Sequence, residues 1–169
     1  MKRTLKKRRR ENKTDYGNRL ELLKSGKPRI VFRMSNKYVV AQYVESKEAK
    51  DKIIFGVTSK DLGKHGWPEN ASGSLKSIPA SYLTGLLIGK EILAKKLKTP
   101  IVDLGMLRTL HKTRVYGFLK GLIDSGLKIS CKEEAFPDES KIKGENLKNK
   151  IPFDEIVENL KWQKNLKKS

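Results

Sequence analysis

The sequence has little of what disulfide scaffolds and membrane spans require. It contains one cysteine, Cys131, which cannot form an intramolecular disulfide, so a secreted disulfide scaffold is excluded and a reducing compartment is expected. The longest apolar stretch, Tyr82–Ile88, is far shorter than the ~20 residues that a transmembrane helix needs. No apolar segment of the secretory kind follows the basic N-terminus. We therefore expect a soluble intracellular protein.

Catalytic motifs are missing as well. His65 and His111 have no cysteine or carboxylate at ligand spacing, and a single cysteine cannot build a Cys-x-x-Cys zinc site. Phosphate-binding glycine loops and nucleophile elbows are absent. Asp103 is the best carboxylate for a metal-dependent nuclease, but two-metal catalysis needs several clustered acids and the others are scattered. We predict no enzymatic activity, no cofactor, no metal and no small-molecule substrate, with Asp103 in a structural or capping role.

Positive charge is abundant instead. The 169 residues hold 38 Lys and Arg against 19 Asp and Glu, a net charge of +19, which in a compact monomer calls for a polyanionic partner. Residues 1–29 account for +9 of this excess. Within this segment, the basic run from Lys2 to Lys13 is interrupted by one acid, Glu11. Such a run cannot pack on itself and is typical of a basic arm that orders on a polyanion, although a solvated tail or a nuclear-import signal has the same composition. Leu5 alone provides no apolar face, so no membrane partner is expected.

Hydrophobic periodicity predicts an α/β fold, a mixed β-sheet with packed helices. A short helix should begin near Tyr16, capped by Thr14 or Asp15, and end before Gly26. Strands are expected at residues 29–34, 38–44, 52–58, 99–104 and, as a final edge strand, 127–129. Longer helices are expected at residues 79–97 and 113–125, and residues 59–77 form a connection that Trp67 would pin.

The chain divides into three predicted parts. Residues 1–13 form the basic arm, residues 14–130 the α/β core domain, and residues 131–169 a mostly helical C-terminal extension with helices near 139–149 and 153–164. The core is expected to end near residue 130. Gly85 and Gly89, four residues apart, would allow their helix to approach the sheet closely.

An RNA-docking surface can be assembled from the first part of the chain. The helix with Arg19, the loop after it and the hairpin turn at residues 35–37 follow one another and could share one side. Arginine offers a rigid fork matched to phosphate and lysine a mobile point charge. Ser35 and Asn36 can bond 2′-hydroxyls or base edges, and Tyr38 or Tyr43 offers a ring for an unstacked base, although each could equally be a turn or sheet residue. No helix has the basic face of a DNA major-groove reader, which favours RNA.

The hairpin also carries a family resemblance. Residues 24–42, KSGKPRIVFRMSNKYVVAQ, resemble the signature of large-subunit ribosomal protein eighteen, the 5S rRNA-binding family. Agreement continues at residues 13–16, 19–20, 80–87, 103–105, 114–115 and 119–121, and residues 137–145 resemble the extension of the archaeal and eukaryotic branch. The similarity spans roughly residues 6–150. At Lys112-Thr113-Arg114 relatives commonly have glycine before the small residue, and the lysine here adds a potential phosphate contact.

The resemblance implies a ribonuclease-H-like fold of translational components without nuclease activity. It also implies a cytoplasmic protein of the large ribosomal subunit that docks 5S rRNA into the central protuberance, beside 23S rRNA and the other 5S-binding ribosomal protein. We expect the arm and first helix to neutralise phosphates and the hairpin to set the register. The predicted RNA-binding residues are Lys6, Lys7, Arg8, Arg9, Arg10, Lys13, Tyr16, Arg19, Lys24, Lys27, Arg29, Arg33, Ser35, Asn36, Lys37, Tyr38, Gln42, Arg108, Lys112 and Arg114.

Two alternatives remain open at this point. One is an RNA chaperone or assembly factor that acts free of the subunit. The other, which the scattered acids already disfavour, is a metal-dependent RNA-processing enzyme that uses Asp103.

Overall fold

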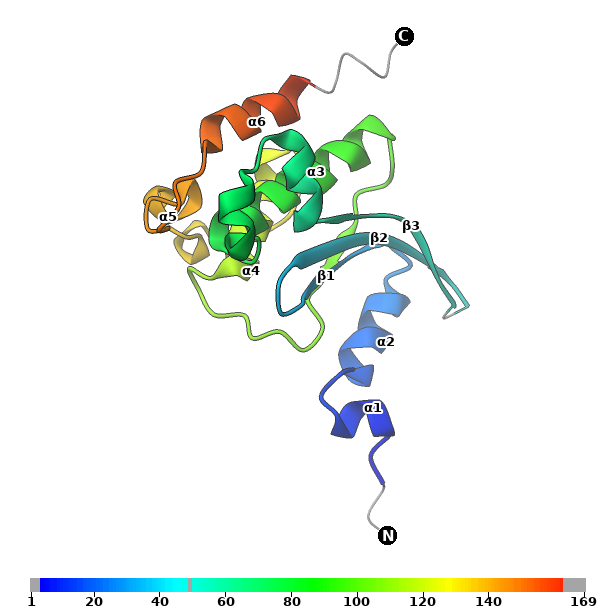
Figure 1. The fold of residues 1–169 in the computed structure, drawn as a ribbon. Coiled ribbons are helices and arrows are strands. Elements are labelled where there is room, and N and C mark those ends of the chain that lie inside the picture. Colours follow the sequence, from blue (N-terminus) through cyan, green and yellow to red (C-terminus); the bar gives the residue numbers. More distant parts are fainter. Residues whose placement is uncertain (1–3, 49, 163–169) are drawn as a thin grey trace.

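The architecture is a mixed sheet with helices on both sides (Figure 1). The structure, a computed structural model, describes residues 4–48 and 50–162. Its 4-stranded sheet consists of β1 (Arg29–Met34), β2 (Val39–Lys47), β3 (Lys50–Thr58) and β4 (Ile101–Asp103). The strand order is β3-β2-β1-β4, with β1 and β3 antiparallel to β2 and β4 parallel to β1. The predicted mixed α/β fold is confirmed.

The β1–β2 hairpin forms because apolar and polar residues alternate along it. Ile30 and Phe32 are fully buried on one face, whereas Arg33 points to the other. The turn closes with a hydrogen bond from the Ser35 backbone N–H to the Tyr38 carbonyl oxygen (2.8 Å). The Ser35 hydroxyl also accepts from the Tyr38 N–H (2.9 Å), so Ser35 acts as a turn residue here.

Helices α3 (Ile78–Ala94) and α4 (Arg114–Asp124) cover the apolar face of the sheet. The ring of Phe118 on α4 lies 4.3 Å, centroid to centroid, from that of Phe32 on β1. A Cβ at Gly85 would overlap the Phe118 carbonyl oxygen, and one at Gly89 would overlap the Ser125 side chain. These glycines therefore allow α3 to approach α4 and its C-cap. The prediction that they bring the helix close to the sheet is wrong.

The N-terminal elements lie on the side of the opposite face, where α2 (Tyr16–Lys24) is tied to β3 by the Arg19–Asp51 ion pair and α1 (Lys7–Arg10) precedes it, farther from the sheet (Figure 1). The Asp15 carboxylate accepts from the backbone N–H groups of Gly17 and Asn18, which confirms it as the N-cap of α2. Helix α2 has no buried residue. This face of the sheet is therefore only partly shielded.

The long connection after β3 is built from two 3-10 helices, η1 (Ser59–His65) and η2 (Glu69–Ser74). Trp67 between them is buried, and its indole N–H donates to the Ala71 carbonyl oxygen (3.1 Å). The predicted pinning by Trp67 is confirmed, although the segment is more regular than a loop.

The C-terminal extension contains η3 (Glu133–Ala135), α5 (Glu139–Lys143) and α6 (Phe153–Trp162). Ile156 is fully buried and Leu160 is 4% exposed, and both belong to the central hydrophobic core. The core therefore continues past residue 130, where it was predicted to end. The predicted C-terminal end of the last helix, at residues 163–164, lies outside the described residues.

The predicted edge strand at residues 127–129 is wrong. The Leu127 N–H bonds the Leu122 carbonyl oxygen, and the Ile129 N–H bonds the Leu127 carbonyl oxygen. These donors close the end of α4 locally and pair with no strand. Leu127 is nevertheless buried, which accounts for its strand-like apolar pattern.

Candidate nucleic-acid interface

Three arginines and two aspartates form a continuous chain of ion pairs on the partly shielded face of the sheet. Arg29 donates to Asp103 Oδ2 (2.9 Å) and to Asp51 Oδ1 (2.7 Å). Arg33 donates to Asp103 Oδ1 (3.1 Å) and to the Asp103 carbonyl oxygen (2.8 Å). Arg19 on α2 donates to Asp51 Oδ2 (2.8 Å). The chain thus ties α2 to strands β3, β1 and β4.

Asp51 is the carboxylate that links Arg19 to Arg29 in this chain. Burial alone would raise its pKa, but the hydrogen bonds from Ser46 and Arg19 and the pairing with Arg29 outweigh burial and lower the pKa below its ordinary value. Asp51 is therefore ionised at neutral pH. Three guanidiniums against two carboxylates leave the chain with a net positive charge.

Both oxygens of Asp103 are occupied. Besides the two arginines, the Gly105 backbone N–H donates to Oδ1 (2.9 Å). Among the described residues no three His, Cys, Asp or Glu side chains lie close enough together to hold a metal ion. These contacts agree with the structural and capping role predicted for Asp103.

The structure separates the two arginines of β1. Arg29 is 1% exposed, and both of its terminal nitrogens are held by the aspartates. It therefore cannot reach a ligand, and the expectation that it contacts RNA is corrected. The Arg33 side chain is 45% exposed while Asp103 holds it. A Cβ at Gly105, which has φ +61°, would lie 2.8 Å from Arg33 Cζ. The glycine therefore leaves room for the Arg33 guanidinium to lie against the backbone.

The basic arm folds back on the start of α2. Its contacts are Lys6 Nζ with the Tyr16 ring (4.7 Å to the centroid), Arg8 Nε with Thr14 Oγ1 (3.0 Å), Arg9 Nη1 with Asp15 Oδ2 (3.3 Å) and Lys13 Nζ with Glu11 Oε2 (2.8 Å). Arg9 also lies 3.5 Å from Met106 Sδ, which links the arm to the loop after β4. Lys7 and Arg10 are exposed and have no ion pair among the described residues.

A small cleft lies where the arm, α2 and the sheet meet. Its volume is about 130 Å³, and its cationic lining residues are Arg8, Lys13, Arg19 and Arg33. Asp15 and Asp103 line it too. The cleft thus brings together predicted RNA-binding residues from the arm, the first helix and β1, which are up to 25 positions apart in the sequence.

The hairpin turn projects two polar side chains. Asn36 and Lys37 are exposed and have no side-chain hydrogen bond or ion pair among the described residues. Tyr38 and Gln42 are half-buried on the hairpin. The hairpin therefore presents amide and ammonium groups at its tip, as predicted.

The predicted residues near α4 lie apart from this group. Lys112 pairs with Asp138 in the C-terminal extension (3.2 Å), and Arg114 Nη1 donates to the Lys76 carbonyl oxygen (3.4 Å). Arg108 is exposed on the connecting loop. Lys24 and Lys27 are exposed at the far end of α2.

Sequence reasoning missed the residues that position the arginines. Asp51 and Ser46 lie on β3 and β2, and Ser46 Oγ donates to Asp51 Oδ1 (2.6 Å). The one signal in the sequence is that Asp51 is an acid flanked by lysines directly before the strand expected at residues 52–58. That pattern does not reveal which arginines it meets.

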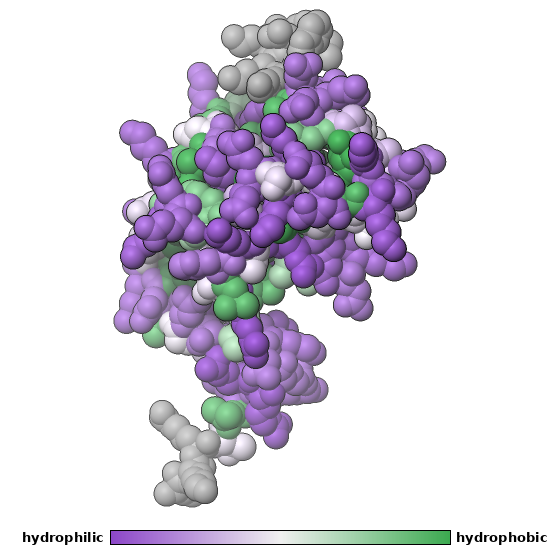
Figure 2. Space-filling view, turned by 90° about the vertical axis from the view of Figure 1, so that its left-hand side faces the viewer, coloured by the Kyte–Doolittle hydropathy of each residue, from purple (hydrophilic) through white to green (hydrophobic). Residues whose placement is uncertain are grey.

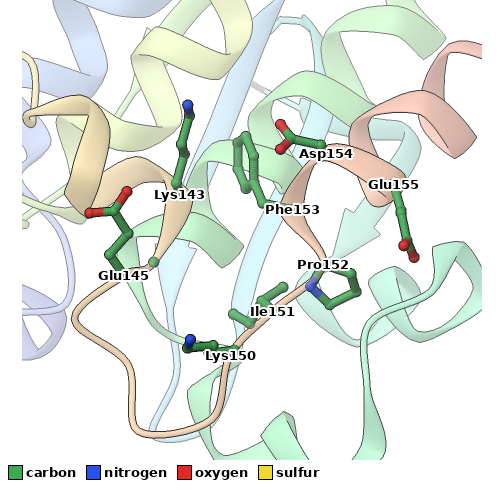
Figure 3. A pocket seen from close by; sticks show the side chains of 9 residues that line it. Lys143, Glu145, Lys150, Ile151, Pro152, Phe153, Asp154 and Glu155 are labelled. Carbon is green, nitrogen blue, oxygen red and sulfur yellow. The ribbon is translucent and has the colours of Figure 1, made fainter.

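The surface elsewhere is mainly hydrophilic. Figure 2 shows hydrophilic side chains over most of one side, with apolar ones in scattered patches. A cavity of about 530 Å³ between α5 and α6 is lined by lysines and carboxylates together, among them Lys143, Lys150, Glu145 and Asp154 (Figure 3). Its mixed charge favours no polyanion. No helix of the described residues is long and apolar enough to cross a membrane.

Comparison with known proteins decides the family. Residues 2–100, which include the arm, α2 and the hairpin, match the family of ribosomal large subunit proteins 60S L5 and 50S L18. The large ribosomal subunit protein uL18 of Korarchaeum cryptofilum is 41% identical over 140 residues, which cover 83% of this chain and 70% of that protein. That of Methanothrix thermoacetophila is 37% identical over 149 residues, covering 88% of this chain and 86% of that protein. The chain belongs to the uL18 family.

This membership has direct consequences for the site. A uL18-family protein is a constituent of the large ribosomal subunit, so this chain is located on cytoplasmic ribosomes among ribosomal RNA and other ribosomal proteins. The family consists of structural proteins and not of enzymes, so the nuclease alternative built on Asp103 is abandoned. Ribosomal RNA, a polyanion, is therefore among the partners of this chain.

Proposed function

We propose that this chain binds 5S rRNA through an N-terminal basic surface, made of the arm (residues 4–13), α2 and the hairpin turn (residues 35–37). It docks the 5S rRNA into the central protuberance, with 23S rRNA and the other 5S-binding ribosomal protein as neighbours. The observation that carries the proposal is the cleft at which Arg8, Lys13, Arg19 and Arg33 converge from separate elements.

The ion-pair chain supports this role by preorganisation. Asp103 and the Phe32 carbonyl oxygen hold the Arg33 guanidinium in one orientation, while 45% of the side chain is exposed. An arginine that is already ordered loses little conformational entropy when it meets a phosphate. Burying Arg29 in the same chain keeps α2 and β1 in fixed relative positions.

The arm and the hairpin have different roles in this proposal. The arm cations, among them Lys7 and Arg10 without ion-pair partners among the described residues, neutralise phosphates regardless of sequence. Asn36 at the hairpin tip has an amide that can both donate and accept hydrogen bonds, which base edges and 2′-hydroxyls require. The hairpin thus sets the register on the RNA.

A binding competition tests the proposal. Dissociation constants are measured at one salt concentration for 5S rRNA and for another structured RNA of similar length. The wild-type chain should prefer 5S rRNA, and the N36A/K37A variant should lose roughly 5- to 150-fold in affinity for 5S rRNA, because base-edge contacts contribute about 1–3 kcal/mol. Its loss on the other RNA should be much smaller.

The control is K132A/K148A, which removes two exposed lysines of the C-terminal extension. It should leave the preference for 5S rRNA unchanged. If N36A/K37A loses affinity equally for both RNAs, the hairpin does not set the register. A wild-type chain without preference for 5S rRNA would refute the proposal as a whole.

A further inference from the structure

Three lysines from three separate segments surround a second basic cavity. Lys27 follows α2, Lys98 precedes β4 and Lys128 follows α4, and all three line a cavity of about 410 Å³. All three are exposed, and none has an ion pair among the described residues. None of the other residues that line this cavity is acidic. We call it the lysine pocket.

The backbone beneath the lysine pocket is held firmly. The Ile101 N–H donates to the Pro28 carbonyl oxygen (2.9 Å), and the Tyr43 hydroxyl donates to the Lys98 carbonyl oxygen (3.0 Å). Pro28 and Pro100 are buried at its floor and restrict both loops. Only the lysine side chains need to become ordered when a ligand binds.

Other cavities of similar size have compensated charge. The cavity between α5 and α6 mixes lysines with Glu145, Asp154 and Glu155 (Figure 3). The cavity of about 450 Å³ at the β2–β3 turn includes Glu45 and Asp51 beside its lysines. In the lysine pocket the like charges repel one another without a carboxylate to offset them, so an anion would stabilise it.

We propose that Lys27, Lys98 and Lys128 form a second binding site for RNA backbone phosphates, separate from the cleft at Arg33. The two sites lie at opposite ends of β1 and β4, since the cleft includes Asp103 and Gly105 whereas the pocket includes Pro28 and Ile101. The 9 residues of α2 between them span about 13–14 Å. The chain can thus hold two backbone segments at once.

RNA is favoured over an acidic protein segment by the overall charge. Beyond the first 29 residues, which carry +9, the chain still has an excess of +10, and RNA is the dominant polyanion of the subunit to which the family belongs. Lysine ammonium groups on long stems suit phosphates at variable positions. The inference rests on the proposed function only in taking RNA as the ligand and does not require 5S rRNA.

The salt dependence of binding tests the lysine pocket. The variant K27A/K98A/K128A is compared with wild type on 5S rRNA and on the large rRNA of the same subunit. The slope of log K against log salt should become shallower by about 2–3 on at least one of these RNAs, at ~0.7–0.9 per lost phosphate contact. The control K60A/K132A/K148A, which also removes three exposed lysines, should change neither slope.

A second measurement identifies the partner in the assembled subunit. In large subunits, Lys27, Lys98 and Lys128 should resist acetylation and become reactive after ribonuclease digestion. Unchanged slopes on both RNAs, or protection that survives the digestion because a protein covers the pocket, would overturn the inference. A wild-type chain without preference for 5S rRNA would refute the proposed function but would leave this result unaffected, so the two proposals fail separately.

Discussion

Arg29 shows how a cation becomes part of the protein interior. Taking a guanidinium out of water is costly unless carboxylates and hydrogen bonds compensate. Here Asp51, Asp103 and Ser46 supply them, while Nε alone has no hydrogen-bond partner among the described residues. The arrangement joins the side chains of all four strands at one point.

Removal of one carboxylate should therefore be severe. In Asp103→Ala, the buried Arg29 keeps only Asp51 as an ionic partner, and Arg33 loses its carboxylate partner while it keeps two backbone carbonyl contacts. We expect a loss of about 3–5 kcal/mol in the free energy of unfolding, measured by urea denaturation, because a buried charge is left partly uncompensated. Glu158→Ala, which removes an exposed carboxylate, should cost far less. A loss below about 1 kcal/mol in Asp103→Ala would mean that solvent, and not Asp103, stabilises Arg29.

Part of this residue-level picture was predictable. The alternation in β1 correctly indicates that Arg29 and Arg33 share a face, because side chains on a strand repeat every two residues. It does not indicate that Asp103, 74 positions further on, reaches both, since that depends on β4 pairing beside β1. The burial of Arg29 follows from this long-range pairing and has no local signal.

At the scale of elements, the packing of α3 on α4 depends on glycines from both helices. A Cβ at Gly121 on α4 would overlap the Tyr82 carbonyl oxygen, as one at Gly85 on α3 would overlap that of Phe118. The two backbones meet where both lack side chains. Because Phe118 lies on α4, the close approach of the two helices also determines the distance between the Phe118 and Phe32 rings.

Gly121→Ala should accordingly destabilise the protein. The alanine methyl group would be forced against backbone atoms that cannot move aside, and overpacking of this kind costs about 1–3 kcal/mol or more. Gly63→Ala is the matched control, because a Cβ there meets nothing within 4 Å. Thermal unfolding followed by circular dichroism measures both. Equal melting temperatures for the two variants would show that the helices can separate without loss.

Elements were predictable where the pattern is local. The limits of β1 and the cap of α2 follow from alternation and from Asp15. The prediction of a strand at residues 127–129 was wrong for a physical reason. An apolar run can be buried where it closes the end of a helix as well as where it joins a sheet. The partner of Gly85 was also misjudged, because a glycine spacing indicates close approach and not what is approached.

At the scale of the whole molecule, the two faces of the sheet differ in chemistry. Helices α3 and α4 shield the apolar face, and the arm with α2 covers the other face only partly (Figure 1). The cleft with its four cationic side chains lies on the partly covered side, and the first 29 residues carry +9 of the net +19. This asymmetry was inferable from the charge distribution, whereas the joining of the C-terminal extension to the core was not.

The arm should make a large contribution to the salt dependence of RNA binding. Replacing Arg8, Arg9 and Arg10 with alanine should make the slope of log K against log salt shallower by about 2–3 on 5S rRNA, at ~0.9 per phosphate contact in duplex regions. Filter binding over a range of salt concentrations measures the slope. K60A/K132A/K148A removes the same number of charges elsewhere and should leave it unchanged. An unaltered slope in the arm variant would remove the arm from the interface.

The burial of Ile156 and Leu160 has a consequence for synthesis. The sheet meander is complete once residue 58 has been made, but the hydrophobic core lacks its last side chains until residue 160 has followed. At ~5–20 residues per second, that interval lasts roughly 5–20 s. In this interval the cationic arm has already been synthesised, whereas the core still lacks Ile156 and Leu160. Each newly made chain therefore offers its charge to nearby RNA before its interior can close.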